Sequence, residues 1–339
     1  MLHLILHVTL ILYHNIRVFQ ALFQALSQGL LFYYRGTKKC VLYKPENLLY
    51  TVLASRGTDP PRSKKSKKKD KTGDYIMNKN TFNQVKLTKG DVSVYDFGEV
   101  KLHAYKTNDF IDDEVFIVEK NGKGVVIESP CFHDNISELT EYLKGMKVEG
   151  VLVAYHGAGA TFLHEVPKYA TQNAVEYSEN GGGKALITNF TAAFGDIFDN
   201  TVHQVTNIIG EGKVTIGGSG FVIHPTHEAF DIEIPEINAV YTHMLGHDCH
   251  SIVAGSGHAD AIISQLRGYI EKGYCLILTS HYTPEDLKDA ETKIAYLEDL
   301  KTIAAESKNA EDFKAKVSAR YPQYSGQNYL DMTAGFFFA

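Results

Sequence analysis

Short apolar runs separated by turn residues dominate the chain from Asp91 onward, and they constrain its fold more than any other feature. Runs of this length that end at turn residues predict consecutive antiparallel strands. The first four runs cover residues 92–97, 100–105, 114–119 and 124–128, with a turn at 120–123 between the last two. We therefore expect this part of the chain to open with an antiparallel sheet.

Helical patterns follow these strands, and the order then repeats. Spacing of apolar residues predicts a helix over 135–146, a buried strand over 150–154 and a helix over 162–178. The second half has predicted strands at 185–188, 213–216, 220–224, 231–234, 237–242 and 275–279, with a helix over 259–272. A long helix is expected to open at Thr283, with Thr283 as N-cap and Pro284 at the first helical position. Two such halves predict an α/β protein with two sheets face to face and helices outside.

The first 76 residues differ from the rest in composition. Residues 1–34 are apolar with Arg17 as their only charged residue, but polar residues interrupt them, and a secretory signal's basic start and cleavage site are missing. Residues 62–71 are a basic run that favours a flexible linker over a nuclear-localisation or lipid-binding segment. The sequence predicts a poorly structured extension over 1–76 and one domain over 77–339. It favours this interpretation over a membrane anchor formed by residues 1–34.

Charge and cysteine content exclude some classes of function. The net charge of -6 provides no excess of basic residues for binding a phosphate backbone, so nucleic acid is not an expected partner. Four cysteines without a CxxC spacing fit neither a disulfide framework nor a thiolate zinc site. These features favour a reducing, cytoplasmic environment and a small-molecule substrate.

Ten of the fifteen histidines lie between His156 and His281, and this density predicts a metal site. Imidazole is the commonest transition-metal ligand in proteins, and zinc, iron or manganese would suit nitrogen and oxygen donors at loop ends. The candidate ligands are His227, His243, His247, His250 and His281. Asp248 could act as a ligand or as a catalytic proton acceptor. Each histidine could instead be a hydrogen-bonded structural residue.

The order of elements over about residues 92–300 resembles the metallo-β-lactamase superfamily. Residues 114–129 are similar to that family's opening hairpin, and the strand over 151–154 precedes the place of its HxHxDH metal-binding motif. This chain has Tyr155-His-Gly-Ala-Gly-Ala160 there, so the four motif positions hold Tyr155, Gly157, Gly159 and Ala160. His156 lies one position out of register and is carried over as a catalytic candidate.

Later motifs match the family better. Residues 217–227 resemble its strand and Pro-Gly-His turn, which places His227 at the third-histidine position. His243 stands where the family has a bridging aspartate, and His281 stands where its last histidine ligand lies. The resemblance implies a four-layer αββα sandwich.

Three functions are compatible with these features. The resemblance favours a metal-dependent hydrolase of an ester, thioester, lactam or phosphodiester bond, in which a bound cation would activate water. A non-catalytic binding protein could keep the fold after losing the metal site. Residues 157–161, after a strand and before a helix, could also form an anion-binding or nucleotide-binding loop. Convergence of the candidate histidines on one point would favour the hydrolase.

Overall fold

The computed structural model describes residues 31–34, 40–43 and 79–339. The chain divides into two compact units, Met1–Ser66 and Lys67–Ala339. In the described part of the first unit, β1 (Leu31–Tyr34) pairs with β2 (Cys40–Tyr43) in antiparallel orientation. The rest of the predicted extension, including its boundary at residue 76, lies outside the described residues. No helix among the described residues is long and apolar enough to cross a membrane.

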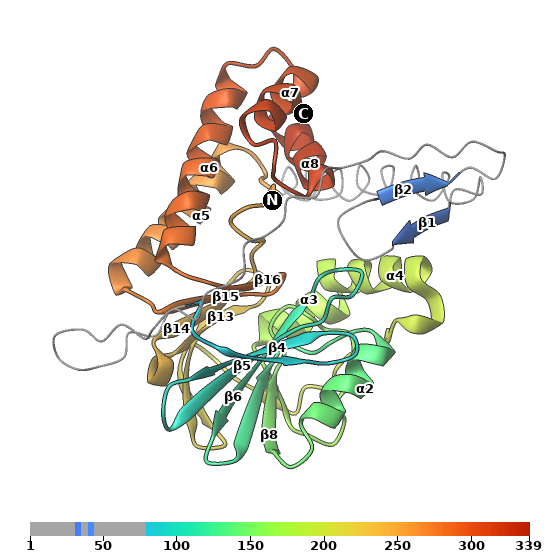
Figure 1. Ribbon diagram of the computed structural model, residues 1–339, viewed down its shortest axis with the longest axis vertical. Helices are drawn as coiled ribbons and strands as arrows, with labels where there is room; N and C mark the ends of the chain where they lie inside the picture. Colours follow the sequence, from blue (N-terminus) through green and yellow to red (C-terminus); the bar gives the residue numbers. More distant parts are fainter. Residues whose placement is uncertain (1–30, 35–39, 44–78) are drawn as a thin grey trace. The chain divides into compact units, whose positions relative to one another are not determined.

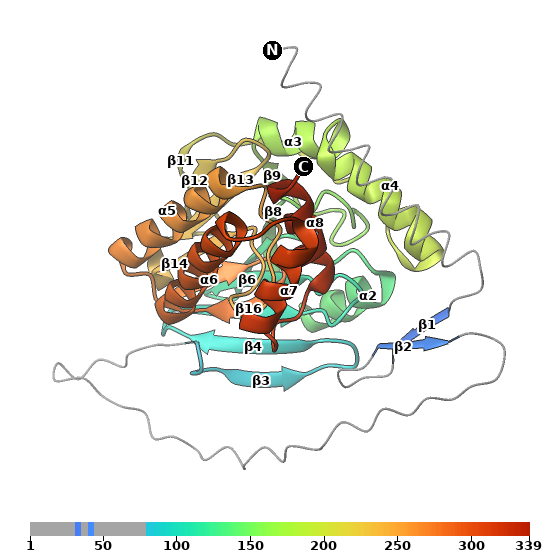
Figure 2. The same ribbon diagram turned by 90° about the horizontal axis from the view of Figure 1, so that it is seen from above.

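One sheet of eight strands forms the first half of the larger unit. Its order in space is β10-β9-β8-β7-β6-β5-β4-β3, with β3 and β4 at one edge (Figure 2). Strands β3 to β7 pair antiparallel, and β7 to β10 pair parallel. The strands are β3 (Asn83–Lys86), β4 (Asp91–Asp96), β5 (Val100–Lys106), β6 (Glu114–Lys120), β7 (Lys123–Ile127), β8 (Lys147–Leu152), β9 (Lys168–Ala170) and β10 (Asn207–Ile208).

A second sheet of six strands follows, in the order in which its strands occur along the chain. All neighbours pair antiparallel except β14 and β15, which run parallel because α5 connects them. The strands are β11 (Gly212–Ile216), β12 (Ser219–Pro225), β13 (Phe230–Ile234), β14 (Ala239–Thr242), β15 (Leu276–Thr279) and β16 (Tyr282–Glu285). A short 3-10 helix, Pro235–Ile237, joins β13 to β14.

Buried side chains alternate between the two faces of each sheet, which fixes the layers. In β6, Phe116 and Val118 point into the core shared by the two sheets, whereas Val115 and Ile117 pack under a helix. In the second sheet, Leu278 joins the shared core and Ile277 faces the opposite way. Each sheet therefore has one face against the other sheet and one face against helices.

Helices cover the two outer faces (Figure 1). α2 (His133–Tyr142) packs on the first sheet. The second sheet carries α5 (Ser256–Lys272), α6 (Leu287–Ala305), α7 (Ala310–Arg320) and α8 (Gln327–Phe337). The predicted αββα sandwich is confirmed.

Residues 185–188 were predicted as a strand, which is wrong. They lie in α4 (Gly182–Phe194), which follows α3 (Gln172–Glu179) and precedes a 3-10 turn at Gly195–Ile197. Four apolar residues alone cannot distinguish a strand from one side of a helix. The helix ends at Gly195, whose φ of 57° is one that residues with a side chain rarely adopt.

The helix expected over 162–178 is wrong in its first half. Turns occupy that part, β9 follows, and only α3 is helical. Pro167 disfavours helical geometry at the residue before it and cannot donate a backbone hydrogen bond. The buried Lys168 ammonium then donates to the carbonyl oxygens of Leu163 at 2.6 Å and Val166 at 2.9 Å, which fixes the turn.

The predicted start of the long helix is wrong by three residues. Thr283 and Pro284 belong to β16, and Asp286 is the N-cap of α6. The Asp286 carboxylate accepts from the backbone N–H groups of Lys288 and Asp289, and Asp289 reaches back to the N–H of Asp286. This reciprocal capping box satisfies backbone donors of the first turn and of the N-cap itself.

Candidate metal centre

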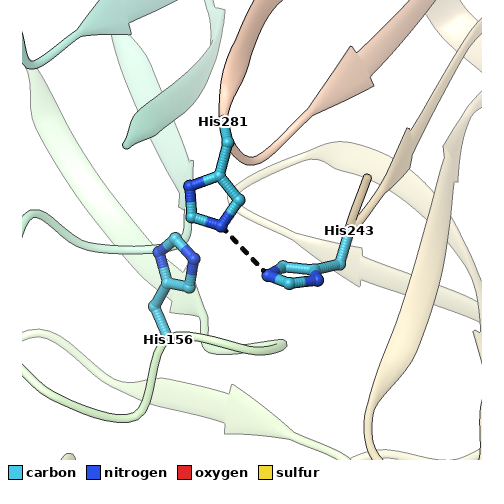
Figure 3. A group of neighbouring side chains, drawn as sticks. All are labelled: His156, His243 and His281. Atoms are coloured by element: carbon cyan, nitrogen blue, oxygen red, sulfur yellow. Dashed lines mark hydrogen bonds between the residues drawn. The ribbon is translucent and has the colours of Figure 1, made fainter. Parts of the chain in front are cut away.

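Three histidines from three strand ends lie against one another (Figure 3). His156 follows β8, His243 directly follows β14, and His281 lies between β15 and β16. The Nε2 atoms of His243 and His281 are 3.2 Å apart. One ring nitrogen from each of the three imidazoles lies within 4.8 Å of the other two. The rings thus share a common point, with His243 exposed and the other two half-buried.

Strand pairing places His243 and His281 side by side. β14 and β15 are parallel neighbours, and Thr242 is registered with Thr279. The residues that follow must therefore leave the sheet at the same edge. The pairing of two short apolar strands thus brings two of the three imidazoles together.

A buried carboxylate holds the loop that carries His156. Glu128, fully buried just after β7, accepts hydrogen bonds from the backbone N–H groups of Tyr155 at 2.8 Å and His156 at 3.0 Å. It also accepts one from the Tyr241 hydroxyl of β14 at 2.5 Å. One side chain of the first sheet therefore connects the loop after β8 with the second sheet.

A second buried carboxylate, Asp113, lies behind the rings. Its Oδ1 is 3.2 Å from Nδ1 of His281, and its Oδ2 is 3.8 Å from Nδ1 of His156. The same Nδ1 of His281 is 3.2 Å from the carbonyl oxygen of Ile111. Burial alone would lower the pKa of His281, but the hydrogen bond to Asp113, its charge and the Ile111 carbonyl outweigh burial and raise that pKa.

His243 has the opposite electrostatic environment. Packing of protein atoms around its ring lowers its pKa well below the usual value, and repulsion from His281 and His156 adds to this. His243 is therefore a neutral imidazole near pH 7, the form that binds metals.

Tyr155 occupies the side of His243 that faces the loop after β8. The two rings stack with centroids 4.5 Å apart and planes 22° from parallel. The Tyr155 hydroxyl lies 3.0 Å from Oγ1 of Thr226 in the turn between β12 and β13. The residue that stands at the first position of the family motif is thus used for packing and hydrogen bonding.

The other candidates from the sequence lie elsewhere. His227 is exposed on the turn after β12 and belongs to neither group of possible ligands among the described residues. His250 is buried under α6, with Nδ1 3.0 Å from the Tyr296 hydroxyl. Asp248 is exposed beside Tyr282, whose pKa is raised by burial and by a hydrogen bond to Asp248. The structure brings together His156, His243 and His281. His227, His250 and Asp248 lie outside that group.

Comparison with known proteins gives the fold. No protein-family model and no curated protein matches the chain. Among solved structures, a double mutant of the sec-alkyl sulfatase PisA1 superposes with a TM-score of 0.51 at 13% identity, over 76% of this chain and 50% of the sulfatase. A metallo-β-lactamase family protein from Thermus thermophilus superposes with a TM-score of 0.50 at 10% identity, over 70% of this chain and 91% of that protein.

The chain has the metallo-β-lactamase fold. This agrees with the resemblance found in the sequence, and identities of 13% and 10% make it a divergent example. The chain spans about half the length of the sulfatase, so the likeness concerns the fold alone. In this metallo-β-lactamase fold, the positions of the HxHxDH motif hold no histidine, and the imidazole of His156 reaches the common point from an adjacent position.

A second group in this metallo-β-lactamase fold consists of His247, Glu285 and Asp289, which also have metal-ligand spacing. His247 Nδ1 lies 2.7 Å from Glu285 Oε1, and its Nε2 lies 3.3 Å from Asp289 Oδ1. Lys79 pairs with the other oxygen of Asp289. Because carboxylates occupy both ring nitrogens and an ammonium group neutralises Asp289, this group is a satisfied ion-pair network. His247 thereby connects the loop after β14 to β16 and α6.

The His247 network predicts a pH-dependent contribution to stability. The hydrogen bond to Glu285 raises the pKa of His247 above its usual value, burial opposes this, and the Glu285, Asp289 and Asp248 charges add to the rise. Stability from the protonated ring is therefore full below the unfolded pKa of about 6.5 and is lost as pH rises through the folded pKa. We expect His247→Gln to lose more free energy of unfolding at pH 5.5 than at pH 8.5, measured by urea denaturation with a chelator present.

The matched control for this measurement is His164→Gln. The side chains of His164 and its partner Glu165 are 71% and 87% exposed, so their ion pair is screened by solvent. The control should lose little stability at either pH. An equal loss at both pH values for His247→Gln would show that its proton does not contribute.

Sequence reasoning missed the two carboxylates that organise the site. Asp113 belongs to the acidic run Asp112-Asp113-Glu114 directly before an apolar strand, and that position was a usable signal. Glu128 was counted only as the end of a strand. Its φ of 67° places it in the left-handed region, which is uncommon for glutamate and marks a special local role.

Proposed function

We propose that this chain is a metal-dependent hydrolase whose single metal ion is held by His156, His243 and His281. The convergence of three imidazoles from separate strand ends is the observation that supports this proposal. Zinc is the expected ion, with iron or manganese as alternatives that accept the same donors. The proposed substrates are small molecules with an ester, thioester, lactam or phosphodiester bond.

The donor set fits such an ion. Tetrahedral zinc with Zn–N bonds of about 2.0–2.1 Å requires ligand nitrogens about 3.4 Å apart. His243 and His281 offer nitrogens 3.2 Å apart, with His156 within 4.8 Å. Three protein ligands leave one position open, which is the pattern of catalytic zinc sites. A bound ion in such a site supplies a water molecule whose pKa is lowered toward neutrality.

The chain's own residues would keep the ligands in place. Glu128 fixes the backbone of the loop that carries His156, Asp113 contacts the rear of two rings, and Tyr155 covers one face of His243. His243 is exposed, so a substrate can reach the group from solvent. Asp248 lies outside the group, and its proposed role as proton acceptor would need the substrate to extend toward Tyr282.

A specific observation favours a second candidate, a binding protein without metal. Tyr155 replaces the first ligand of the family motif and stacks on His243. Without an ion, the 3.2 Å contact between His243 and His281 is a hydrogen bond between neutral rings. A cluster of imidazoles of this kind could hold a polar ligand without chemistry.

Metal content and hydrolysis, measured on the same full-length preparation, test the proposal. After chelation and dialysis against zinc, we expect about one zinc per chain by plasma mass spectrometry. We also expect zinc-dependent turnover of a chromogenic ester, thioester, lactam or phosphodiester. His156→Ala should lose both properties, whereas His164→Ala, exposed and outside the group, should keep both. Folded protein that takes up no metal would favour the binding protein.

A further inference from the structure

We infer that Asp113 is a positioning residue that favours a proton on Nδ1 of His156, as the Ile111 carbonyl does for His281, so that the Nε2 atoms of both rings are free to accept an ion. The inference deepens the proposed function and rests on it where it concerns metal affinity. Its basis is the placement of one buried carboxylate between two of the three rings.

The position of Asp113 leaves it little else to do. The residue directly precedes β6 and has no exposed side-chain surface. Its only ion pairs among the described residues are those with His281 at 3.2 Å and His156 at 3.8 Å. A buried carboxylate without a compensating charge is strongly disfavoured. No lysine or arginine of the described part pairs with Asp113, so the two imidazoles are the polar side chains that its oxygens face.

Hydrogen-bond chemistry fixes the proton on His281. Nδ1 of this ring faces both Asp113 and the carbonyl oxygen of Ile111, and a carbonyl oxygen can only accept. Nδ1 of His281 must therefore carry hydrogen. Its Nε2 then has a free lone pair directed at His243, 3.2 Å away.

His156 depends on Asp113 alone. Its Nδ1 is buried without any hydrogen-bond partner among the described residues, and the nearest charge is Oδ2 of Asp113 at 3.8 Å. That distance is too long for a hydrogen bond, but a nitrogen lone pair facing a carboxylate would be repelled across it. The charge therefore favours Nδ1–H on His156 and leaves Nε2 unprotonated.

The substitution Asp113→Asn should change the protonated nitrogen of His156 but not that of His281. An asparagine offers one acceptor oxygen and one NH₂ donor in place of two acceptors. Its oxygen should face His281, where Nδ1–H is fixed by Ile111, and its NH₂ should then face His156. The charge that favoured Nδ1–H on His156 is then gone, and the NH₂ dipole favours a lone pair on Nδ1 and the proton on Nε2. That proton blocks the nitrogen that faces the common point (Figure 3).

Long-range ¹H–¹⁵N NMR of metal-free, full-length protein at pH 8 tests this inference, with rings assigned from His156→Gln and His281→Gln. We expect Nδ1–H on both rings in the wild type and a switch of His156 alone to Nε2–H in Asp113→Asn. The matched control is Asp112→Asn, because Asp112 is exposed in the same loop and asparagine tolerates its φ of 54°. Nε2–H on either ring in the wild type, or no switch in Asp113→Asn, would overturn the inference. The wild-type spectrum decides even if that variant does not fold.

Zinc affinity provides the second measurement. Residues that orient a ligand typically change metal affinity about 10–100-fold, so Asp113→Asn should bind zinc that much more weakly than Asp112→Asn. Equal zinc affinity in the two variants would contradict the role of Asp113 toward the ion. If no variant and no wild-type protein binds zinc, the proposed hydrolase fails, while the tautomers in the metal-free spectrum still decide what Asp113 does.

Discussion

Glu128→Ala should lower the free energy of unfolding by about 3 kcal/mol or more, because a buried carboxylate that satisfies three donors is removed. Two backbone N–H groups, of Tyr155 and His156, and the Tyr241 hydroxyl would lose their acceptor. Alanine keeps a β-carbon at a φ of 67°, so the backbone strain is the same in both proteins and the variant isolates the carboxylate. Urea denaturation followed by circular dichroism measures the loss.

Two further variants serve as controls for the stability loss in Glu128→Ala. Glu99→Ala, on the exposed turn between β4 and β5, should change stability by less than about 0.5 kcal/mol. Glu128→Gln keeps the shape and one acceptor oxygen, so it should lie between the wild type and Glu128→Ala. A loss below about 1 kcal/mol in Glu128→Ala would mean that water replaces the carboxylate and that the loop after β8 does not depend on it.

His243→Ala should weaken zinc binding by more than about 100-fold, since the loss of a ligand exceeds the 10–100-fold effect of losing an orienting neighbour. The same substitution at His227 should change affinity by less than about threefold, because His227 is exposed and outside the group. Competition with a chromogenic chelator measures both values on full-length protein. The pair is well matched, because family resemblance nominated both histidines and only geometry separates them.

The opposite result would have a clear structural meaning. If His227→Ala and His243→Ala weakened zinc equally, the turn between β12 and β13 would have to move toward the site when the ion binds. That turn is already connected to the site by the Tyr155–Thr226 contact, so the movement would break or shift this hydrogen bond. The ligand set would then follow the family positions rather than the arrangement described above.

Two local patterns predicted strands correctly: alternation of buried and half-buried residues in β12 and β13, and continuous apolar runs in β6 and β15. β6 and β15 contain apolar residues in succession because one face meets the other sheet and the opposite face meets helices. Residues 185–188 carry the same local signal in a helix, where tertiary context decides. Local pattern therefore identified the two sheets, but it misassigned residues 185–188 and the first half of 162–178.

The candidate site was predictable only as far as strand ends determine it. His243 and His281 follow parallel neighbouring strands, so their proximity could be expected from the order of elements. His250 could not be separated from them, because its partner Tyr296 lies 46 residues further along the chain on α6. The loop path that carries His250 away from the group depends on packing, which residue type and spacing do not encode.

The three histidines are divided between the two sheets, so they meet only when the sheets pack in the correct register. His156 belongs to the first sheet, His243 and His281 belong to the second, and the Glu128–Tyr241 hydrogen bond crosses between them. A slip of one residue between the sheets would move the donors by about 3.3 Å and separate the imidazoles. An ion held at their common point would therefore stabilise only the sandwich with correctly packed sheets. A compact chain whose strands have formed but whose sheets are misaligned would gain no stability from the ion.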